Sequence, residues 1–464
     1  MMLSELGART EGQLIGDDQS FSVVSTDTRT LSPGDLFVAI RGDRFDGHTF
    51  VEKAVECGAC AVVVESPQDH VYATQLVVND SVVALGQAGA LNRTAFSGKV
   101  LAITGSNGKT TVKGMLHSIM SEHCSTLATE ANFNNHIGVP LTLMRLNDSY
   151  GAAVIEAGTS GKSEIAYLAN LIQPEIALVN NVMAAHLLGF GSEEAIAKEK
   201  AEIYSAGKVK VGVVNLNCAY KDVFMAKLSG KKIFGFAVET QTEKRIILTP
   251  VFAEQGNAVV VALVQPLGEN ESLSFKFLWQ GNEFPVQLNI CGAHNIANAA
   301  AAAACALAAD VQIESIVSGL EKFSGVPGRM QITPSVRCAL LVDDTYNANP
   351  GSMRAAINHL SQYDKSLLIV GDMGEIGEGE LAAHEKMGCY AHAKGIEQVI
   401  GVGELSRTLV KAYGKNGISF GSCTEAIEYL ETTDISEFSV LVKGSRSAKM
   451  ERIVQQLEQS GGGI

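Results

Sequence analysis

The chain has 464 residues, which corresponds to about three domains at roughly 100 to 200 residues per domain. Its composition, with 46% hydrophobic and 19% charged residues, is that of a globular protein and excludes a disordered or fibrous one. Lys and Arg total 36 against 50 Asp and Glu, a formal charge of −14. That balance excludes the broad positive field of a protein that binds nucleic acid or anionic membrane, although a local site can still bind phosphate.

The cysteines and the first residues bear on metal binding and on the cellular location of the protein. Nine cysteines lie mostly in apolar runs, and the only close pair is Cys57 and Cys60. One CxxC pair is weak evidence for zinc, so we predict that all nine are reduced core residues. Residues 1–13 lack the pattern of a secretory signal, and no run of about 18 apolar residues occurs, so we expect a cytoplasmic protein without a membrane segment.

Residues 1–98 read as a small α/β unit. Short β-type runs alternate with loops and short helices at Phe21 to Ser25, Leu36 to Ile40, Cys60 to Glu65 and Gln75 to Val78.

Residues 99–326 begin a second unit of a different kind. A continuous apolar strand, Lys99 to Thr104, ends in a glycine loop and is followed by a helix from Thr111 to about Glu122, the opening of a βαβ unit. Further buried strands are predicted at Ala152 to Glu156, Ile176 to Asn180 and Val211 to Asn215. Residues 231–290 suggest antiparallel edge strands, and the alanine-rich segment Asn295 to Ala309 predicts a closely packed helix.

Residues 327–464 predict a second, doubly wound parallel sheet. Its strands are expected at Ala339 to Val342, Ser366 to Val370, Gln398 to Val402 and Ser439 to Val442, and its helices at Ser352 to Gln362, Leu381 to Lys394 and Thr424 to Glu431. Ligands of such sheets bind beyond the carboxyl ends of the strands, so chemistry is expected in the residues that follow each strand.

The clearest motif is the segment TGSNGKTT at residues 104–111, between a predicted strand and a predicted helix. Its N–H groups can bind phosphate, Lys109 can reach the β and γ phosphates, and the Thr110 hydroxyl can bind Mg²⁺. It is shorter than a Walker A loop, because Ile103 stands where that loop has a glycine. The alternative is an ordinary turn with an exposed lysine.

Three more residues are weaker candidates. Glu156 ends a strand near the glycine loop, and a carboxylate beside polyphosphate favours a divalent cation between them. His186 also follows a strand, but a lone histidine is more often structural. Taken alone, residues 198–204, which include Lys200, read as the charged face of a helix.

Three polar loops follow strands of the third block, at residues 343–350, 371–375 and 443–447. They predict a second binding face along the carboxyl edge of that sheet. The alternative for residues 343–350 is a turn with Asx hydrogen bonds that leads into the next helix.

Together these segments resemble the Mur ligases, the ATP-dependent ligases of peptidoglycan synthesis, over nearly the whole chain. Within that family DDTYNANP at 343–350 and VKGSRS at 442–447 are most similar to the ligases that add D-alanyl-D-alanine. The resemblance also rests on residues 27–29, 33–39, 46–48, 104–111, 132–140, 180–186, 190–192, 294–298, 328–329 and 371–375. The DNPR segment of the ligase that adds the third residue is absent from the sequence.

The resemblance implies an α/β fold of three domains: residues 1–98 binding the UDP end of the substrate, 99–326 binding ATP, and a Rossmann-like 327–464. It implies that ATP drives the joining of D-alanyl-D-alanine to UDP-N-acetylmuramoyl-tripeptide through an acyl phosphate, with Mg²⁺, in a monomer. The implied catalytic residues are Lys109, Glu156, His186 and Lys200, and the implied Mg²⁺ ligands are Thr110, Glu156, His186 and Lys200 as a carbamate. Implied ATP contacts are Gly105, Ser106, Asn107, Gly108, Lys109, Thr110, Thr111, Asn295, Asn298, Arg329 and Asp344. Implied substrate contacts are Thr28, Arg29, Asn135, Thr159, Ser160, Asn347 and Lys443.

One segment departs from the family pattern. Where the family commonly has Gly-Ala-Asn-His-x-Gly-Glu-Ile, residues 158–165 read GTSGKSEI, which leaves the peptide contacts of this loop open. The sequence also leaves open whether the third peptide residue is diaminopimelate or lysine. Two other functions stay open as well, another amide ligase of the folylpolyglutamate type and a nucleotide-dependent switch protein.

Overall fold

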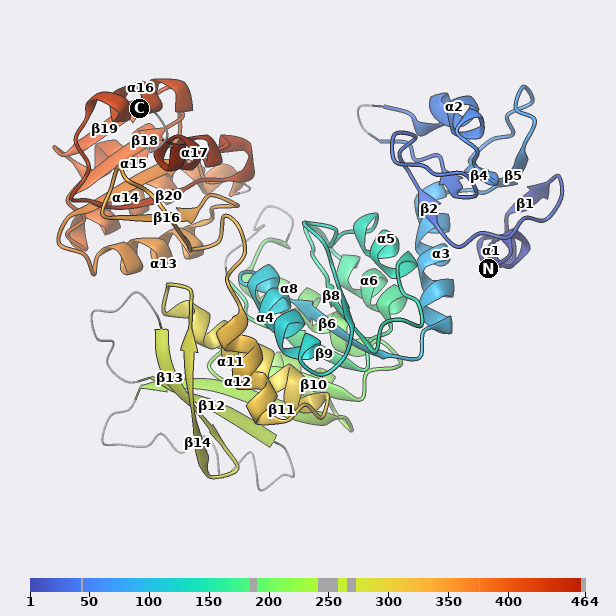
Figure 1. The fold of residues 1–464 in the computed structure, drawn as a ribbon, viewed down its shortest axis with the longest axis horizontal. Coiled ribbons are helices and arrows are strands. Elements are labelled where there is room, and N and C mark those ends of the chain that lie inside the picture. The colour runs from blue at the N-terminus through green and yellow to red at the C-terminus, as the bar shows by residue number, and fades with distance from the viewer. Residues whose placement is uncertain (43–44, 184–189, 241–257, 265–272, 375, 460–464) are drawn as a thin grey trace.

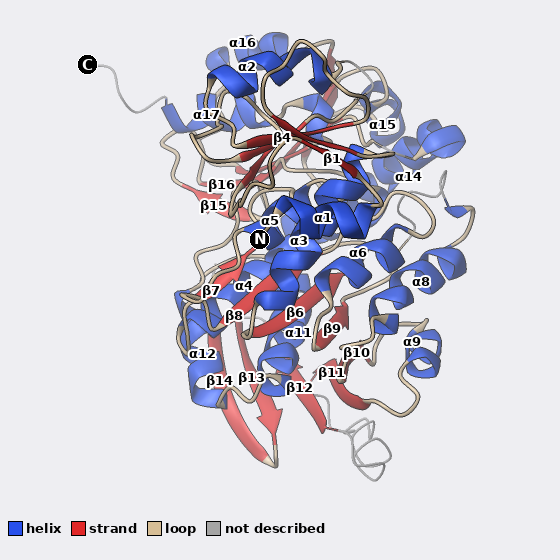
Figure 2. Ribbon diagram, turned by 90° about the vertical axis from the view of Figure 1, so that its right-hand side faces the viewer, coloured by secondary structure: helices blue, strands red, loops and turns tan. Residues whose placement is uncertain are grey.

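The computed structural model describes residues 1–464 except 43–44, 184–189, 241–257, 265–272, 375 and 460–464. Within these residues the strands form three sheets, and each sheet comes from one of the three predicted blocks (Figure 1). The two smaller sheets lie above the central one in Figure 2. The α/β class and the three-part architecture are thus as expected, while the residues that separate the domains stay a prediction.

The N-terminal sheet has the order β1-β5-β4-β3-β2, parallel except for β1. Its elements are α1 Leu3–Thr10, β1 Gln13–Ile15, β2 Val24–Ser25, β3 Leu36–Val38, η1 Gly47–Phe50, α2 Val51–Glu56, β4 Ala61–Val64, β5 Thr74–Val77 and α3 Ser81–Ala95. The four predicted strands are present, each within three residues of its expected ends. The long helix α3 and the edge strand β1 were not predicted, because neither carries a clear apolar period.

Helix α3 attaches this sheet to the central part of the chain. A Cβ on Gly89 would lie 2.9 Å from Cα of Pro140 in α5 (Gly138–Met144), so only glycine allows the two helices to approach this closely. The buried Arg93 donates to the carbonyls of Ile172 and Gln173, at the end of α6 (Glu164–Ile172), and to the carboxylate of Glu175. A guanidinium therefore satisfies the last carbonyls of a helix in the neighbouring part.

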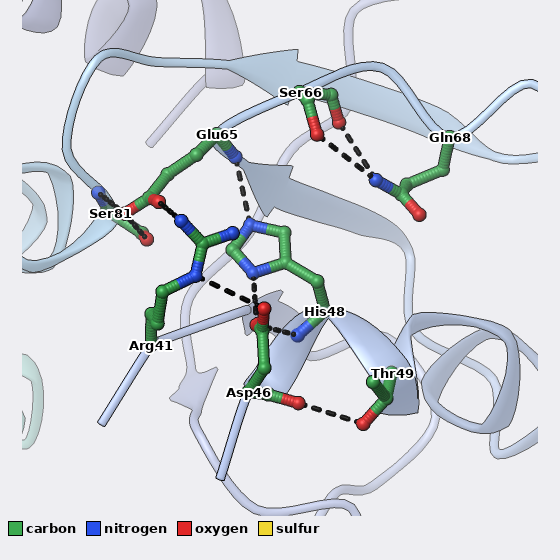
Figure 3. A network of polar contacts seen from close by, with 8 residues as sticks. All are labelled: Arg41, Asp46, His48, Thr49, Glu65, Ser66, Gln68 and Ser81. Atoms are coloured by element: carbon green, nitrogen blue, oxygen red, sulfur yellow. Dashed lines mark hydrogen bonds and ion pairs between the residues drawn. The ribbon is translucent and has the colours of Figure 1, made fainter. Parts of the chain in front are cut away.

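The residues 46–48 of the N-terminal part form a polar network (Figure 3). The Glu65 N–H donates to His48 Nε2 (2.9 Å), which leaves the ring proton on Nδ1, and Nδ1 lies 2.6 Å from Asp46 Oδ1. Hydrogen bonds from His48 lower the pKa of Asp46 to about 2. Arg41 contacts both carboxylates, with 3.0 Å to Asp46 and 3.4 Å to Glu65. The ring of His48 is therefore a bridge between the loop before η1 and the end of β4.

The central sheet has the order β14-β13-β12-β11-β10-β9-β6-β8-β7 among the described residues. Its strands are β6 Lys99–Thr104, β7 Thr126–Ala128, β8 Ala152–Glu156, β9 Ile176–Val179, β10 Val211–Asn215, β11 Lys232–Thr240, β12 Ala258–Val264, β13 Leu273–Trp279 and β14 Asn282–Leu288. The expectation of antiparallel strands over residues 231–290 is correct for β13 and β14, but wrong for β11 and β12, which pair in parallel. Parallel pairing continues the βα order of the preceding strands.

Helices cover both faces of the central sheet. One face packs against α4 Lys109–Ser121, α11 His294–Ala308 and α12 Ile313–Lys322, and the other against α5, α6, α8 Glu193–Ala201, η2 Glu202–Ser205 and α9 Lys221–Lys227. The alanines at 299–304 are fully buried in α11, which packs against α4. Small side chains let these two helices lie close together at the start of the nucleotide-binding loop.

The C-terminal sheet has the order β15-β16-β20-β17-β18-β19 and is parallel apart from the edge strand β15. Its strands are β15 Gln331–Thr333, β16 Leu340–Asp344, β17 Ser366–Gly371, β18 Gln398–Val402, β19 Gly417–Phe420 and β20 Ser439–Lys443. Its helices are α13 Pro350–Leu360, η3 Gly377–Gly379, α14 Glu380–Ala393, α15 Ser406–Tyr413, α16 Cys423–Thr432, η4 Arg446–Ala448 and α17 Glu451–Gln459. The doubly wound sheet is as predicted.

All nine cysteines are free thiols, as expected, but Cys389 on α14 is exposed, so the prediction of nine core cysteines is wrong there. Cys389 lies on the side of α14 that faces solvent. Among the described residues no helix has both the length and the apolar character needed to cross a membrane.

We expect that His48→Ala destabilises the N-terminal part. The substitution leaves the Glu65 N–H without its acceptor, a loss of about 1–3 kcal/mol, while Asp46 loses the imidazole but keeps Arg41. The calorimetric unfolding midpoint should fall by several degrees, whereas the exposed His123→Ala is a matched control without effect. Equal midpoints for the two variants would contradict the bridging role.

Candidate active site

The predicted site residues converge on one cavity of about 1120 Å³, where the carboxyl ends of central strands face those of the C-terminal sheet. Sixteen predicted residues line it: Ser106, Asn107, Gly108, Lys109, Thr110, Thr111, Asn135, Glu156, Thr159, Ser160, Asn295, Asn298, Arg329, Asp344, Asn347 and Lys443. Gly105, Lys200, Thr28 and Arg29 are not among the lining residues, and His186 lies outside the described part of the chain.

The glycine loop turns sharply from β6 into α4. Gly108 has a φ of +77°, and a Cβ there would lie 2.4 Å from Asn298 Oδ1, so glycine is required both for the turn and for the close approach of α11. The Lys109 ammonium donates to the carbonyls of Gly105 (2.8 Å) and Ser106 (3.4 Å). The N–H groups at the start of α4 and this lysine together form an anion site.

Two asparagines after β9 hold the loop in shape, and the sequence pattern did not single them out as site residues. Asn181 Oδ1 accepts from the Asn107 N–H (2.9 Å), and the side-chain amides of Asn180 and Asn181 both donate to the Asn107 carbonyl (3.0 Å each). Asn180 also donates to Asn298 Oδ1 (3.0 Å). The signal that could have found them is their position directly after a buried strand next to β6.

Asn295 and Asn298, two of the expected ATP contacts, are buried on the first turns of α11. Asn295 donates to the Cys291 carbonyl (2.7 Å) and accepts from the Asn298 amide (2.8 Å). Because Asn298 also accepts from Asn180, it links α11 to the glycine loop. Both side chains line the cavity from this fixed position.

Glu156, at the end of β8, is buried next to the loop. Its Oε1 accepts from the Asn134 amide (2.8 Å), but its buried Oε2 has no hydrogen-bond partner among the described residues. A buried carboxylate oxygen without a partner is costly unless a cation completes its surroundings. The arrangement therefore fits a divalent cation that the Thr110 hydroxyl could share.

Lys113 is a residue that the sequence interpretation missed. Its buried ammonium donates to the Thr129 carbonyl (2.6 Å) and lies 3.9 Å from Glu156 Oε2. Burial lowers the pKa of Lys113, and the negative charge of Glu156 opposes that shift. Its place on α4, one turn after Lys109, was the available signal, because such residues share a helix face.

Lys200 is buried on α8, and so is its neighbour Glu199, whereas Lys198 is exposed and pairs with Glu194 (2.7 Å). The interpretation of this segment as a charged face is thus correct for Lys198 and wrong for the other two, because α8 turns that side toward the core. Burial lowers the pKa of Lys200 far below its usual value, Lys109 lowers it further, and Glu199 partly opposes this. A lowered pKa increases the share of the neutral amine.

The structure describes three of the four predicted metal ligands. Among the described residues, no three His, Cys, Asp or Glu side chains gather into a cluster that could hold a metal. Of the four predicted ligands, the structure describes Thr110, Glu156 and Lys200, of which Glu156 alone is a carboxylate. The set fits Mg²⁺ in character, since this ion binds few protein ligands and keeps phosphate and water oxygens.

Arg329 reaches the glycine loop from the segment before β15. Its guanidinium lies over the Tyr346 ring, 4.0 Å from the ring centroid, and its Nη2 donates to Thr110 Oγ1 (3.0 Å). Asn349, which caps α13, donates to Asn107 Oδ1 (2.8 Å). Residues about 220 to 240 positions apart along the chain thus meet at the loop.

The other C-terminal residues form a buried ion pair. The Lys443 ammonium, at the end of β20, lies 2.6 Å from Asp344 Oδ2 at the end of β16 and donates to the Asn347 carbonyl (2.9 Å). Asp344 Oδ1 accepts from the Met330 N–H (3.3 Å). These bonds fix Asp344, an expected ATP contact, relative to Asn347 and Lys443, two expected substrate contacts.

The opposite wall contains Asn135, Thr159 and Ser160. Asn135 Oδ1 accepts from the Ile137 and Gly138 N–H groups at the start of α5 (3.1 and 2.8 Å). Thr159 donates to the Gly161 carbonyl (2.7 Å), and the Ser160 N–H donates to the Glu164 carboxylate. The loop that departs from the family pattern therefore still lines the cavity.

Thr28 and Arg29 lie on the N-terminal part, away from the lining residues. Arg29 is exposed and pairs with Asp27 (2.5 Å), whose pKa the guanidinium lowers to about 2. A substrate bound at both places must extend between the two parts.

The comparisons with known proteins cover the same three parts. Residues 20–92 match the family model "Mur ligase family, catalytic domain", residues 103–306 match "Mur ligase middle domain", and residues 328–446 match "Mur ligase, glutamate ligase domain". The chain is 39% identical to the UDP-N-acetylmuramoyl-tripeptide--D-alanyl-D-alanine ligase of Escherichia coli (strain K12), over 99% of this chain and 98% of that protein. The chain belongs to the Mur ligase family.

Solved structures agree with this Mur ligase assignment. MurF from Acinetobacter baumannii superposes with a TM-score of 0.86 at 33% identity, over 98% of each chain. The MurF ligase from Thermotoga maritima in complex with ADP superposes with a TM-score of 0.81 at 26% identity, over 94% of this chain and 97% of that one.

Lys113→Met should increase the stabilisation that MgATP gives this Mur ligase. Without the ammonium, Glu156 is a buried carboxylate with no cation nearby, so the ligand-free protein melts lower, by about 2–4 °C for each kcal/mol lost. MgATP then restores more than in the unmodified protein. The melting temperatures of the unmodified protein, Lys113→Met and the surface control Lys99→Met are compared. Each is measured without ligand, with MgATP and with ATP plus EDTA. Equal MgATP increments in all three proteins would contradict it.

Proposed function

We propose that the chain is an ATP-dependent ligase that joins D-alanyl-D-alanine to UDP-N-acetylmuramoyl-tripeptide in peptidoglycan synthesis, forming ADP and phosphate. The observation that carries the proposal is the shared cavity, in which the glycine loop and Glu156, whose Oε2 has no hydrogen-bond partner among the described residues, face Arg329, Asp344 and Lys443. Full-length similarity to ligases that carry this name supports the choice of substrates.

The reaction would take place in two steps. The terminal carboxylate of the tripeptide attacks the γ-phosphorus of ATP, and the bond to the β-phosphate oxygen breaks, which gives an acyl phosphate and ADP. The amine of D-alanyl-D-alanine then attacks the acyl carbon, a tetrahedral intermediate forms, and phosphate leaves as the amine loses a proton. No covalent bond to the protein is needed, so catalysis comes from positioning and charge neutralisation.

The chain's own residues have distinct tasks in this scheme. The loop N–H groups and Lys109 bind the β and γ phosphates, and Arg329 approaches the same phosphates from the C-terminal side. Thr110, Glu156 and His186 would hold Mg²⁺, which supplies positive charge to the polyphosphate. Closure of the C-terminal part over the loop excludes water from the acyl phosphate.

Lys200 would act as a carbamate. Only a neutral amine adds CO₂, with loss of one proton, and the burial that lowers the pKa of Lys200 favours that form. The product is an anion that can hold a second Mg²⁺, which a cationic lysine cannot do.

The remaining assignments extend this proposal. Asn295 and Asn298 would face adenine, Asp344 the ribose and Arg329 a phosphate, while Thr28 and Arg29 would contact the uridine end. Asn135, Thr159, Ser160, Asn347 and Lys443 would contact the peptide substrates. Residues 1–98, 99–326 and 327–464 would be the domains of a cytoplasmic monomer.

Sustained ADP release should require both UDP-N-acetylmuramoyl-tripeptide and D-alanyl-D-alanine. Purified protein with MgATP is assayed with each substrate omitted in turn, and Lys109→Ala should lower the full rate by at least about a hundredfold. A folylpolyglutamate-type ligase would instead depend on a folate and glutamate, and a switch protein would release ADP slowly with neither substrate. Either pattern would overturn the proposal, and full activity of Lys109→Ala would overturn the loop assignment.

Lys200→Ala should lose activity that short-chain carboxylates partly restore. A small carboxylate can occupy the space of the missing carbamate and supply its negative charge. The exposed neighbour Lys198→Ala is the matched control and should keep its rate with or without acetate. An active Lys200→Ala protein, or an inactive one that acetate and formate leave unchanged, would contradict the carbamate.

A further inference from the structure

Glu199 joins the helix that carries Lys200 to the loop that lines the cavity. Its buried carboxylate accepts from the Ser163 N–H (Oε2, 2.8 Å) and from the Ile165 N–H (Oε1, 2.9 Å). Both donors belong to the start of α6, directly after the Thr159–Ser160 loop. Charge-assisted hydrogen bonds of this kind are stronger than neutral ones, and two of them fix a direction as well as a distance.

The backbone at this point needs such support. Ser163 has a φ of +67°, in the left-handed region that side chains other than glycine rarely occupy. This chain has a serine at this position. Glu199 accepts from the N–H of the strained Ser163 and from that of Ile165, and this acceptor belongs to another helix rather than to the loop itself.

A second carboxylate completes the restraint on the loop. Glu164 Oε2 accepts from the N–H groups of Ser160 (2.7 Å) and Gly161 (3.2 Å). Two glutamates thus take four backbone donors between residues 160 and 165, and Thr159 and Ser160 are held at the cavity wall. Glu164 moves with α6, so Glu199 alone of the two ties the loop to α8.

We propose that Glu199 is a positioning residue that sets the Thr159–Ser160 loop in register with Lys200. Because Glu199 and Lys200 are adjacent on α8, the place of the peptide-binding wall and the place of the buried amine are fixed by one helix. The inference rests on the proposed function, in which this wall contacts the tripeptide of the nucleotide. Glu199 would then affect how the tripeptide is held and leave ATP binding unaffected.

Glu199→Gln tests this, since the isosteric amide offers one acceptor oxygen for two N–H groups. We expect the KM for UDP-N-acetylmuramoyl-tripeptide to rise about tenfold, with the KM for ATP unchanged and kcat changed less. Hydrogen exchange of the amides in 160–165 should accelerate. Adding Ser163→Gly, which removes the strained serine, should restore part of the KM, and Glu199→Asp should be intermediate.

The control is Glu194→Gln, which removes an exposed carboxylate from the same helix and should change neither readout. A lower melting temperature with unchanged KM and exchange would show a purely structural role and overturn the inference. If Glu199→Gln does not fold, the Glu199→Gln/Ser163→Gly protein and Glu199→Asp decide by the same two readouts. Absence of tripeptide-dependent ADP release in the unmodified protein would instead overturn the proposed function, and the exchange result would still test the restraint on the loop.

Discussion

The hydrogen bonds from Arg329 to Thr110 and from Asn349 to Asn107 are the interactions on which the site depends. Each parallel sheet offers a polar edge at the carboxyl ends of its strands, but one edge alone leaves bound phosphate open to water. These bonds bring the two edges together at the glycine loop. Both are partly buried side-chain bonds, so they shield the loop from water where the two edges meet.

Charge is the second constraint, because an acidic chain must bind polyanions. Lys109, Arg329 and Lys443 line the cavity, and the buried Lys113 lies behind it next to Glu156. Three of these four side chains have different kinds of partner. Lys443 forms an ion pair with Asp344, Lys113 contacts the Thr129 carbonyl and Glu156, and Arg329 lies over the Tyr346 ring. Desolvation makes them costly without anions nearby, and nucleotide phosphates supply those anions. The net charge of −14 therefore describes the surface and not the site.

The strands that could be predicted best are those buried on both faces. β6, β8 and β10 lie at their expected residues, because such strands are continuous apolar runs bounded by polar turns. The parallel pairing of β11 with β12 could not be predicted, because the alternation of apolar and polar residues in a strand does not show in which direction its neighbouring strand runs. The glycine loop was predictable from local sequence. Lys113, Asn180 and Glu199 were not, because their roles arise from partners 16 to 118 residues away.

The segment at Lys198 to Lys200 shows why three adjacent charges cannot be interpreted together. Lys198 faces solvent, Glu199 accepts from the start of α6, and Lys200 is buried toward Lys109. A carbamate at Lys200 would place a second anion beside Glu199, which is unfavourable for two bare carboxylates. The N–H groups of Ser163 and Ile165 and the positive end of α6 offset the charge of Glu199. Helix α6 thus makes it feasible for Glu199 to hold the Thr159–Ser160 loop while its neighbour Lys200 carries the proposed carbamate.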